Sequence, residues 1–224
     1  MIIDGNLAKA KKYLDLISAR SEQERDKLRG PCITISRETG ANARKYGEQL
    51  LLQLPQFQKH STSPWAYFDK ELIDKIINDH DWPQRYSEYL FDKNSSVFGD
   101  YINELLGLHT GMYAIQRKIV KSIVRLAEQG NVIIVGRGAN IITAKMSNSF
   151  HIRLTASLEK RINHLVDYHK LSPAEAIEFI ETEEEARKKY IKKNFLKDID
   201  DPQLYHLIIN INLFNDEEVT EVDR

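Results

Sequence analysis

Apolar residues form short β-branched runs along the chain, and stretches with helical spacing separate these runs. Continuous apolar runs bounded by turn residues predict buried strands, whereas apolar residues three and four positions apart predict amphipathic helices. Parallel neighbouring strands need crossovers of about a dozen residues, and the intervening helical stretches supply them. The pattern therefore predicts an α/β fold with a five-stranded parallel sheet flanked by helices. The expected strands cover 32–35, 65–68, 131–135, 150–155 and 204–211.

The first 30 residues lie outside this alternation. Leu7, Ala10, Leu14 and Ile17 share one helical face, and the helix is expected to continue toward Leu28 before Gly30 and Pro31 end it. We expect a helical extension over 1–30, able to contact a partner protein, and a main domain over 31–224.

Three further segments of the main domain have clear signals. Asp69 is a good N-cap for a helix over 72–77, and Ser172-Pro173 with Glu175 opens a long helix over 172–195. The segment 81–113 is irregular and rich in aromatic residues, so it predicts a small helical cap. Its rings could stack on a base, but packing is the favoured interpretation.

Composition excludes several classes of protein. The 224 residues carry 32 Lys and Arg against 33 Asp and Glu, a formal charge of -1, so neither nucleic acid nor an anionic membrane is an expected partner. No run approaches the roughly 20 apolar residues of a membrane span. The single cysteine, Cys32, allows no internal disulfide and fits a reducing compartment, so the cytoplasm is expected. The seven histidines show no zinc-binding spacing.

A polar loop joins the first predicted strand to a helix, which is the geometry in which backbone N–H groups can hold a phosphate. Against the phosphate-loop pattern G-x-x-x-x-G-K-[ST], alanine takes the lysine's place and arginine the hydroxyl's. On spacing alone, an ordinary strand-to-helix turn is the favoured interpretation. The candidate phosphate-binding residues are Ser36, Arg37, Gly40, Ala41, Asn42, Ala43, Arg44 and Lys45.

Four motifs in order resemble the cytidylate kinase-like family of phosphate-loop nucleoside monophosphate kinases. They are ISRETG at 35–40, WAYFDKEL at 65–72, VIIVGRGAN at 132–140, and the segments 184–195 and 201–210, the latter reading DPQLYHLIIN. The resemblance spans about 33–210. It implies a three-layer sandwich with a phosphate loop after the first strand, a monophosphate-binding region after the second, and a late lid. It also implies phosphoryl transfer from ATP with magnesium.

The chain departs from the family at the phosphate loop. Members typically read I-S-R-E-x-G-S-G-G, where cytidylate kinases carry the lysine loop, and this chain has Ala41-Asn42-Ala43 in place of S-G-G. Phosphoryl transfer depends on positioning and on stabilising developing charge, so another cation must replace the lysine. Arg37, Arg44 and Lys45 are the nearest candidates.

Other candidate site residues follow later strands. Arg137 lies between two glycines after the strongest strand. It is either an incidental exposed arginine of a turn or, as its position and the resemblance to the family favour, the residue that holds the acceptor phosphate. Asp69 either contacts the nucleotide or serves only as an N-cap. Arg187, three positions after Glu184 as in the family's lid, either closes over the transferring group or belongs to a solvated helix. Three i,i+4 pairs would stabilise such a helix, namely Glu183 with Arg187, Glu184 with Lys188 and Glu185 with Lys189. Arg161 is either a second lid cation or an arginine at an apolar edge.

Two functions are consistent with these residues. The first is an ATP-dependent phosphotransferase acting on a nucleoside monophosphate or a related small molecule, with Arg137, Arg187 and Arg44 as catalytic residues and Asp69, Arg137 and Arg161 binding substrate. The alternative is a catalytically silent nucleotide-binding or phosphate-binding module whose N-terminal helix serves a partner. The sequence identifies no metal ligands.

Overall fold

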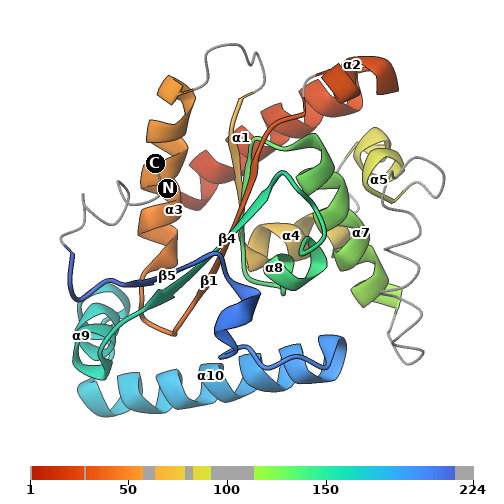
Figure 1. Ribbon diagram of the computed structural model, residues 1–224. Coiled ribbons are helices and arrows are strands. Elements are labelled where there is room, and N and C mark those ends of the chain that lie inside the picture. The colour runs from red at the N-terminus through yellow and green to blue at the C-terminus, as the bar shows by residue number, and fades with distance from the viewer. Residues whose placement is uncertain (1, 28, 58–63, 79–82, 92–113, 215–224) are drawn as a thin grey trace.

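The computed structural model describes residues 2–27, 29–57, 64–78, 83–91 and 114–214 (Figure 1). Within them, five parallel strands form one sheet in the order β2-β3-β1-β4-β5, which confirms the predicted α/β fold. The central strand is β1, and its Ile33 pairs with Ile133 on one side and Phe150 on the other. The strands are β1 (Cys32–Arg37), β2 (Ala66–Phe68), β3 (Val132–Val135), β4 (Ser149–Thr155) and β5 (Leu207–Asn210).

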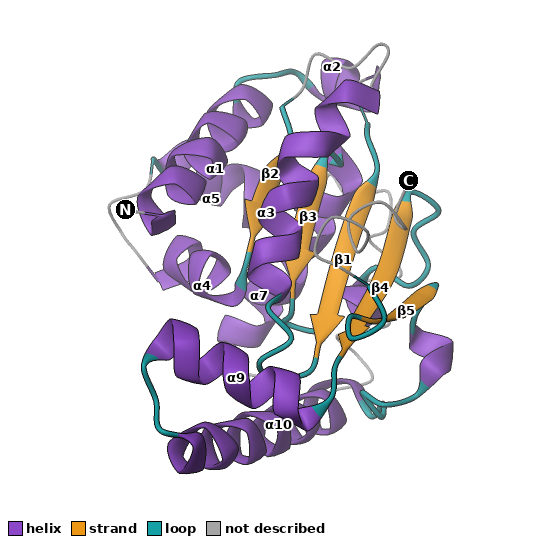
Figure 2. Cartoon of the chain, turned by 90° about the vertical axis from the view of Figure 1, so that its left-hand side faces the viewer, coloured by secondary structure: helices purple, strands orange, loops and turns teal. Residues whose placement is uncertain are grey.

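Helices cover both faces of the sheet, so the molecule has three layers (Figure 2). Successive side chains of a strand point to opposite faces. On β1, Ile33 and Ile35 pack in one core with helix α3 (Ala43–Gln53), whereas Cys32 belongs to the core on the other face with α7 (Ala114–Gln129). This second core also takes in residues of α1 (Ile2–Ser18), α4 (Lys70–Asn78), α5 (Gln84–Phe91) and α8 (Ala139–Ile142).

The N-terminal segment is two helices rather than one. Helix α1 ends at Ser18 and α2 (Glu22–Lys27) follows, so the predicted continuation of one helix toward Leu28 is wrong. Ser21 and Glu24 exchange N-terminal capping hydrogen bonds, which favours a new helix start there. The Tyr13 hydroxyl of α1 donates to the Gly130 carbonyl at 2.7 Å, and the Tyr13 side chain is fully buried. The apolar face of α1 is therefore covered by the chain's own core.

Local signals in the sequence place several other helix starts. Asp69 caps α4 by accepting from the Leu72 amide at 2.9 Å, as its position predicted. Ser172 and Glu175 form the predicted capping box of α10 (Pro173–Phe195). The last strand is shorter than expected, because Asp201 caps a 3-10 turn over Pro202–Leu204 before β5 begins. Of the expected cap over 81–113, most lies outside the described residues.

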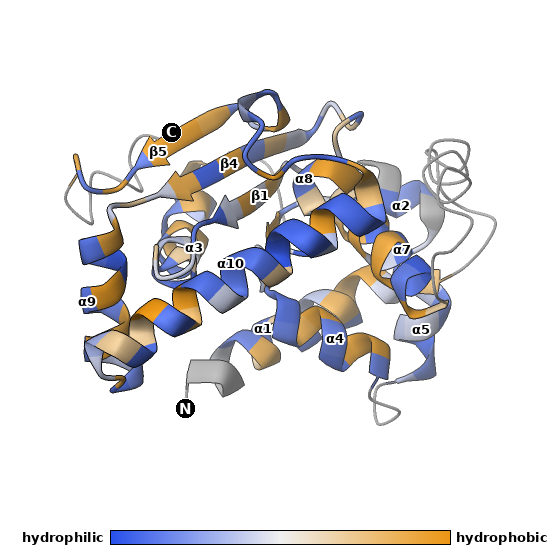
Figure 3. Ribbon diagram, turned by 90° about the horizontal axis from the view of Figure 1, so that it is seen from below, coloured by the Kyte–Doolittle hydropathy of each residue, from blue (hydrophilic) through white to orange (hydrophobic). Residues whose placement is uncertain are grey.

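Helices α9 (Leu158–His169) and α10 form a hairpin beyond the carboxyl ends of the strands (Figures 2 and 3). Leu165, Ala176 and Ile180 make a small core between the two helices. Helix α10 crosses below the sheet and faces the loop that follows β1 (Figure 1). Within the described ranges, no helix combines the length and apolar character needed to cross a bilayer.

Candidate functional site

Three hollows adjoin one another where the parallel strands end, which is the usual ligand position in an open α/β sheet. Their volumes are about 270, 190 and 750 Å³. All three are lined by Arg37, the last residue of β1, and by Arg187 of α10. These two arginines therefore stand at the centre of the candidate site.

The loop after β1 curls into a turn before α3 begins. Gly40 has φ +86° and Asn42 has φ 50°, both in the left-handed region, and the Ala41 amide donates back to the Glu38 carbonyl at 3.2 Å. Asn42 caps α3 through its side chain, which accepts from the Lys45 amide at 3.4 Å. A side chain at Gly40 would lie 2.7 Å from the Arg161 carbonyl, so glycine permits the close approach of α9. The largest hollow is lined by this loop and the start of α3, including Gly40, Asn42, Ala43, Arg44 and Lys45.

Arg37 is held against the turn that follows β3. Gly136 has φ +85°, and a Cβ there would lie 2.5 Å from the Arg37 Nη1 atom, so a larger residue would displace the guanidinium. Burial lowers the pKa of Arg37, while the carboxylates of Asp69, Glu71 and Glu183 oppose that shift. The part of the chain that the structure describes gives Arg37 no ion pair.

Arg187 reaches from α10 to the same loop. Its guanidinium donates to the Arg37 carbonyl at 2.9 Å and to the Thr39 hydroxyl at 3.1 Å. Burial and the positive charge of Arg37 lower the pKa of Arg187 to about 10. Two guanidinium groups of like charge lie close together in a partly desolvated site, and an anion between them would relieve their repulsion.

Glu184 of α10 accepts a hydrogen bond from a backbone amide of the loop after β1. Its carboxylate accepts from the Thr39 N–H at 3.3 Å and pairs with Arg161, which also donates to the Thr39 carbonyl at 3.4 Å. Arg161 is 9% exposed, lies 3.8 Å from Glu38 and pairs with Glu184, so it joins the loop after β1 to α10. A side-chain carboxylate therefore contacts the loop where a bound phosphate was expected.

The predicted charge pairs along α10 are only partly present. Glu183 lies 3.9 Å from Arg187, and Glu185 lies 2.6 Å from Lys189, as the spacing predicted. The expected pair of Glu184 with Lys188 is wrong, because Glu184 turns to Arg161. Lys188 instead pairs with Asp200 at 2.7 Å.

The remaining predicted residues line the hollows but have partners of their own. Arg137 adopts φ 54°, pairs with Asp74 of α4 and lies over the Tyr190 ring at 5.8 Å. Arg44 pairs with Glu48 at 3.0 Å. Asp69 lines the largest hollow, and burial raises the pKa of its carboxyl. Among the described residues, no group of three or more histidine, cysteine or acidic side chains could hold a metal ion.

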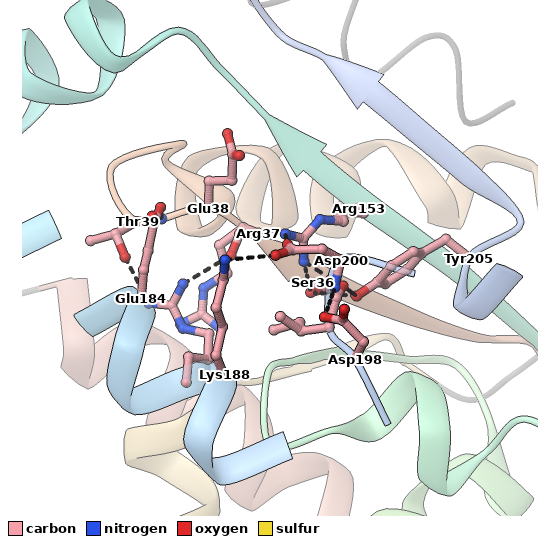
Figure 4. A network of polar contacts seen from close by, with 12 residues as sticks. Ser36, Arg37, Glu38, Thr39, Arg153, Glu184, Lys188, Asp198, Asp200 and Tyr205 are labelled. Atoms are coloured by element: carbon pink, nitrogen blue, oxygen red, sulfur yellow. Dashed lines mark hydrogen bonds and ion pairs between the residues drawn. The ribbon is translucent and has the colours of Figure 1, made fainter. Parts of the chain in front are cut away.

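Sequence reasoning missed a buried polar cluster beneath the loop (Figure 4). Arg153 of β4 is 7% exposed and donates to Asp200 at 2.6 Å and to the Ser36 and Tyr205 hydroxyls at 3.3 Å each. Asp200, which also binds Lys188, thereby joins the loop after α10 to β4. The sequence did contain a signal for this cluster, since Arg153 stands between apolar residues of a predicted strand. A charge buried in a sheet requires a partner, so a nearby carboxylate could have been expected.

A family model and one solved structure agree with this fold. The model of the cytidylate kinase-like family matches residues 32–213, and no curated protein matches the chain. An uncharacterized protein from Eubacterium ventriosum ATCC 27560 superposes with a TM-score of 0.63 at 16% identity, covering 87% of this chain and 99% of that chain. A shikimate kinase from Bacteroides thetaiotaomicron gives a TM-score of 0.45 at 17% identity, with 85% and 92% coverage. Because the family match spans most of its length, the chain belongs to the cytidylate kinase-like family.

Proposed function

We propose that the protein is an ATP-dependent phosphotransferase acting on a nucleoside monophosphate or a related phosphorylated small molecule. The observation that carries this proposal is the meeting of Arg37 and Arg187 at the junction of three hollows beyond the strand ends. Membership of a kinase-like family supports it. Phosphoryl transfer needs little covalent chemistry from the protein, and convergent cations supply the stabilisation that it does need.

Each part of the site has a role in this proposal. The curled loop from Ser36 to Lys45 faces the donor phosphates with the N-terminus of α3, and Arg187 contacts the transferring group. Arg137 holds the acceptor phosphate, for which it exchanges its pairing with Asp74. Arg44 would have to release Glu48 to contribute in the same way. Arg37 takes over the neutralising role of the missing lysine, since its side chain lines all three hollows at the end of β1.

ATP and magnesium are compatible with the residues present. Magnesium is commonly held by one or two carboxylates together with substrate phosphates and water, so the absence of a three-carboxylate cluster among the described residues is no obstacle. Asp69, Glu71 and Glu183 line the largest hollow, and one or two of these carboxylates would hold the ion together with the phosphates and water. When bound, magnesium would neutralise charge on the phosphate oxygens.

Two observations favour a second candidate function, a catalytically silent module that binds a nucleotide or another phosphorylated ligand. Ala43 stands at the lysine position, and the Glu184 carboxylate contacts the Thr39 amide. In that case the loop would bind anions without promoting transfer. A partner of the N-terminal segment would then meet the polar side of α1, because its apolar side is buried.

The test combines two measurements on the full chain. Calorimetry with ATP and magnesium measures binding, and a coupled assay of ADP release across a panel of monophosphates measures transfer. We expect both binding and transfer, with Arg137→Ala lowering turnover at least tenfold, since arginine contacts to a transferring phosphoryl group are worth about 10³ or more in rate.

The matched control is Arg85→Ala, because Arg85 forms an exposed pair with Asp15 away from the hollows. This variant should keep the wild-type turnover. Binding without turnover would support the silent module instead. Absence of both would refute a nucleotide-dependent function.

A further inference from the structure

Four aromatic rings form a continuous row near the tip of the α9–α10 hairpin. The His164 and Tyr168 rings lie parallel, with centroids 5.7 Å apart and an interplanar angle of 11°. Tyr168 meets the His169 ring edge-on at 5.1 Å, and His169 lies 6.4 Å from the Phe179 ring of α10. All four rings line the 750 Å³ hollow that also contains the loop after β1.

The hairpin does not bury these rings to fill its own core. That core consists of Leu165, Ala176 and Ile180, which are at most 3% exposed. Tyr168 is 57% exposed and Phe179 is 42% exposed. Large exposed rings that gather in a concave site provide surfaces on which a planar ligand can stack.

The charged residues that line the same hollow indicate what kind of planar ligand fits. Arg44 and Lys45 at the start of α3 line the hollow, as do Arg37 and Arg187. The ligand should therefore combine a flat ring with a phosphate. A nucleotide has this composition. The hollow also holds carboxylates, and Arg44 pairs with Glu48, but Arg37 has no ion pair among the described residues, so a phosphate would supply its counter-charge.

His164 provides an independent observation at the same place. Both of its ring nitrogens are buried, and neither has a hydrogen-bond partner. Burial lowers the pKa of His164, and the positive charges of His169 and Lys45 lower it further, so the neutral ring is favoured. Buried polar atoms without partners cost free energy, so a ligand that offers His164 a hydrogen bond would gain affinity.

We propose that this row of rings is the subsite that binds the heteroaromatic base of a nucleotide, with the phosphates directed toward Arg37 and Arg187. The proposal rests on the proposed function and adds Tyr168 and Phe179 as residues that determine specificity for a ring-bearing phosphate. The base belongs either to the acceptor monophosphate or to the donor triphosphate. Base stacking on an aromatic side chain supports an effect of about tenfold on affinity.

The experiment compares ring-bearing ligands with ringless analogues by calorimetry on the full chain. Cytidine monophosphate is paired with ribose 5-phosphate, and a non-hydrolysable ATP analogue with magnesium is paired with tripolyphosphate and magnesium. We expect Tyr168→Ala and Phe179→Ala to weaken one ring-bearing ligand about tenfold and to leave its ringless analogue within about twofold. The ring-bearing ligand that loses affinity identifies the acceptor or the donor as the source of the base.

Phe150→Ala is the matched control, because Phe150 is also 42% exposed but does not line this hollow. Equal losses for ring-bearing and ringless ligands, unchanged affinities in both variants, or no binding of any nucleotide would overturn the inference. These outcomes are separate from the test of transfer. A protein that binds nucleotides through Tyr168 and Phe179 yet releases no ADP would retain this subsite and refute the phosphotransferase proposal.

Discussion

Replacing Glu184 by glutamine should raise the affinity of the loop for polyphosphate. The Glu184 carboxylate accepts from the Thr39 amide at 3.3 Å, so its charge lies where a phosphate would approach. Glutamine keeps an oxygen that can accept from the same amide but removes the negative charge. Because glutamine has nearly the same shape as glutamate, any change in affinity reports the repulsion between the Glu184 charge and the bound phosphate.

The size of the effect follows from the position of the charge. At about 6 Å and an effective dielectric constant of about 20, two unit charges interact by about 3 kcal/mol. The Glu184 side chain is 29% exposed, so solvent screens part of this repulsion and about 1 to 2 kcal/mol remains. That range corresponds to a gain of about 5-fold to 30-fold in affinity.

Stability should change in the opposite direction. Glu184 pairs with Arg161, whose side chain is 10% exposed, and the loss of a charge-assisted hydrogen bond costs about 1 kcal/mol or more. The assays are calorimetric titration with tripolyphosphate and denaturant unfolding of the same preparations. The expected result is tighter binding together with a lower free energy of unfolding.

Glu185→Gln is the control for this prediction, because Glu185 is the next residue of α10 and forms an exposed pair with Lys189. Its substitution should measurably change neither the affinity for tripolyphosphate nor the free energy of unfolding. If Glu184→Gln binds tripolyphosphate more weakly than the wild type, or if both variants behave alike, the carboxylate does not compete with anions at the loop and this reasoning is refuted.

Three further predictions test the packing of the site and of the rest of the fold. Asp200→Asn should lower the free energy of unfolding by about 1.5 to 3 kcal/mol, because it leaves the buried Arg153 without its carboxylate. Lys188→Met, which removes only the exposed partner of Asp200, should lower it by less than about 1 kcal/mol. Equal losses in denaturant titrations would contradict this difference. Tyr13→Phe should cost about 1 kcal/mol in the same assay by removing a buried hydrogen bond to Gly130, and an unchanged value would show that α1 is not anchored there. Burial lowers the pKa of His151 to about 4, below the ordinary value of about 6.5, so the neutral ring stabilises the fold above pH 6.5 and this contribution is lost as pH falls toward 4. Unfolding measured at several pH values should therefore show a shallower acid decline in His151→Gln, and an identical decline would assign the loss to other groups.

Elements whose signals are local could be predicted from the sequence. The apolar run at 132–135 and the capping residues Asp69 and Ser172 act within a few positions of the chain, and the structure reproduces the elements that they predicted. The predicted N-terminal helix is too long, because charged residues such as those after Ile17 are as common inside a helix as in the turn between two helices. Only the capping pair of Ser21 with Glu24 marks the second start.

The ion pairs of the site depend on contacts between distant segments, and periodicity does not predict them. Glu184 pairs with Arg161 of another helix rather than with Lys188 on its own, and Lys188 turns to Asp200. The partnership of Arg153 with Asp200 joins residues 47 positions apart. The sequence indicated which residues surround the loop, whereas their partners depend on how α10 crosses the strand ends.

The most direct test of the central claim is a crystal structure of the protein with a non-hydrolysable ATP analogue and magnesium. We expect phosphate density between the curled loop and α10, in contact with Arg37 and Arg187, with the Glu184 carboxylate displaced from the Thr39 amide. Density for the analogue elsewhere on the molecule, or an unliganded loop with Glu184 still bound to Thr39 at saturating analogue, would contradict it.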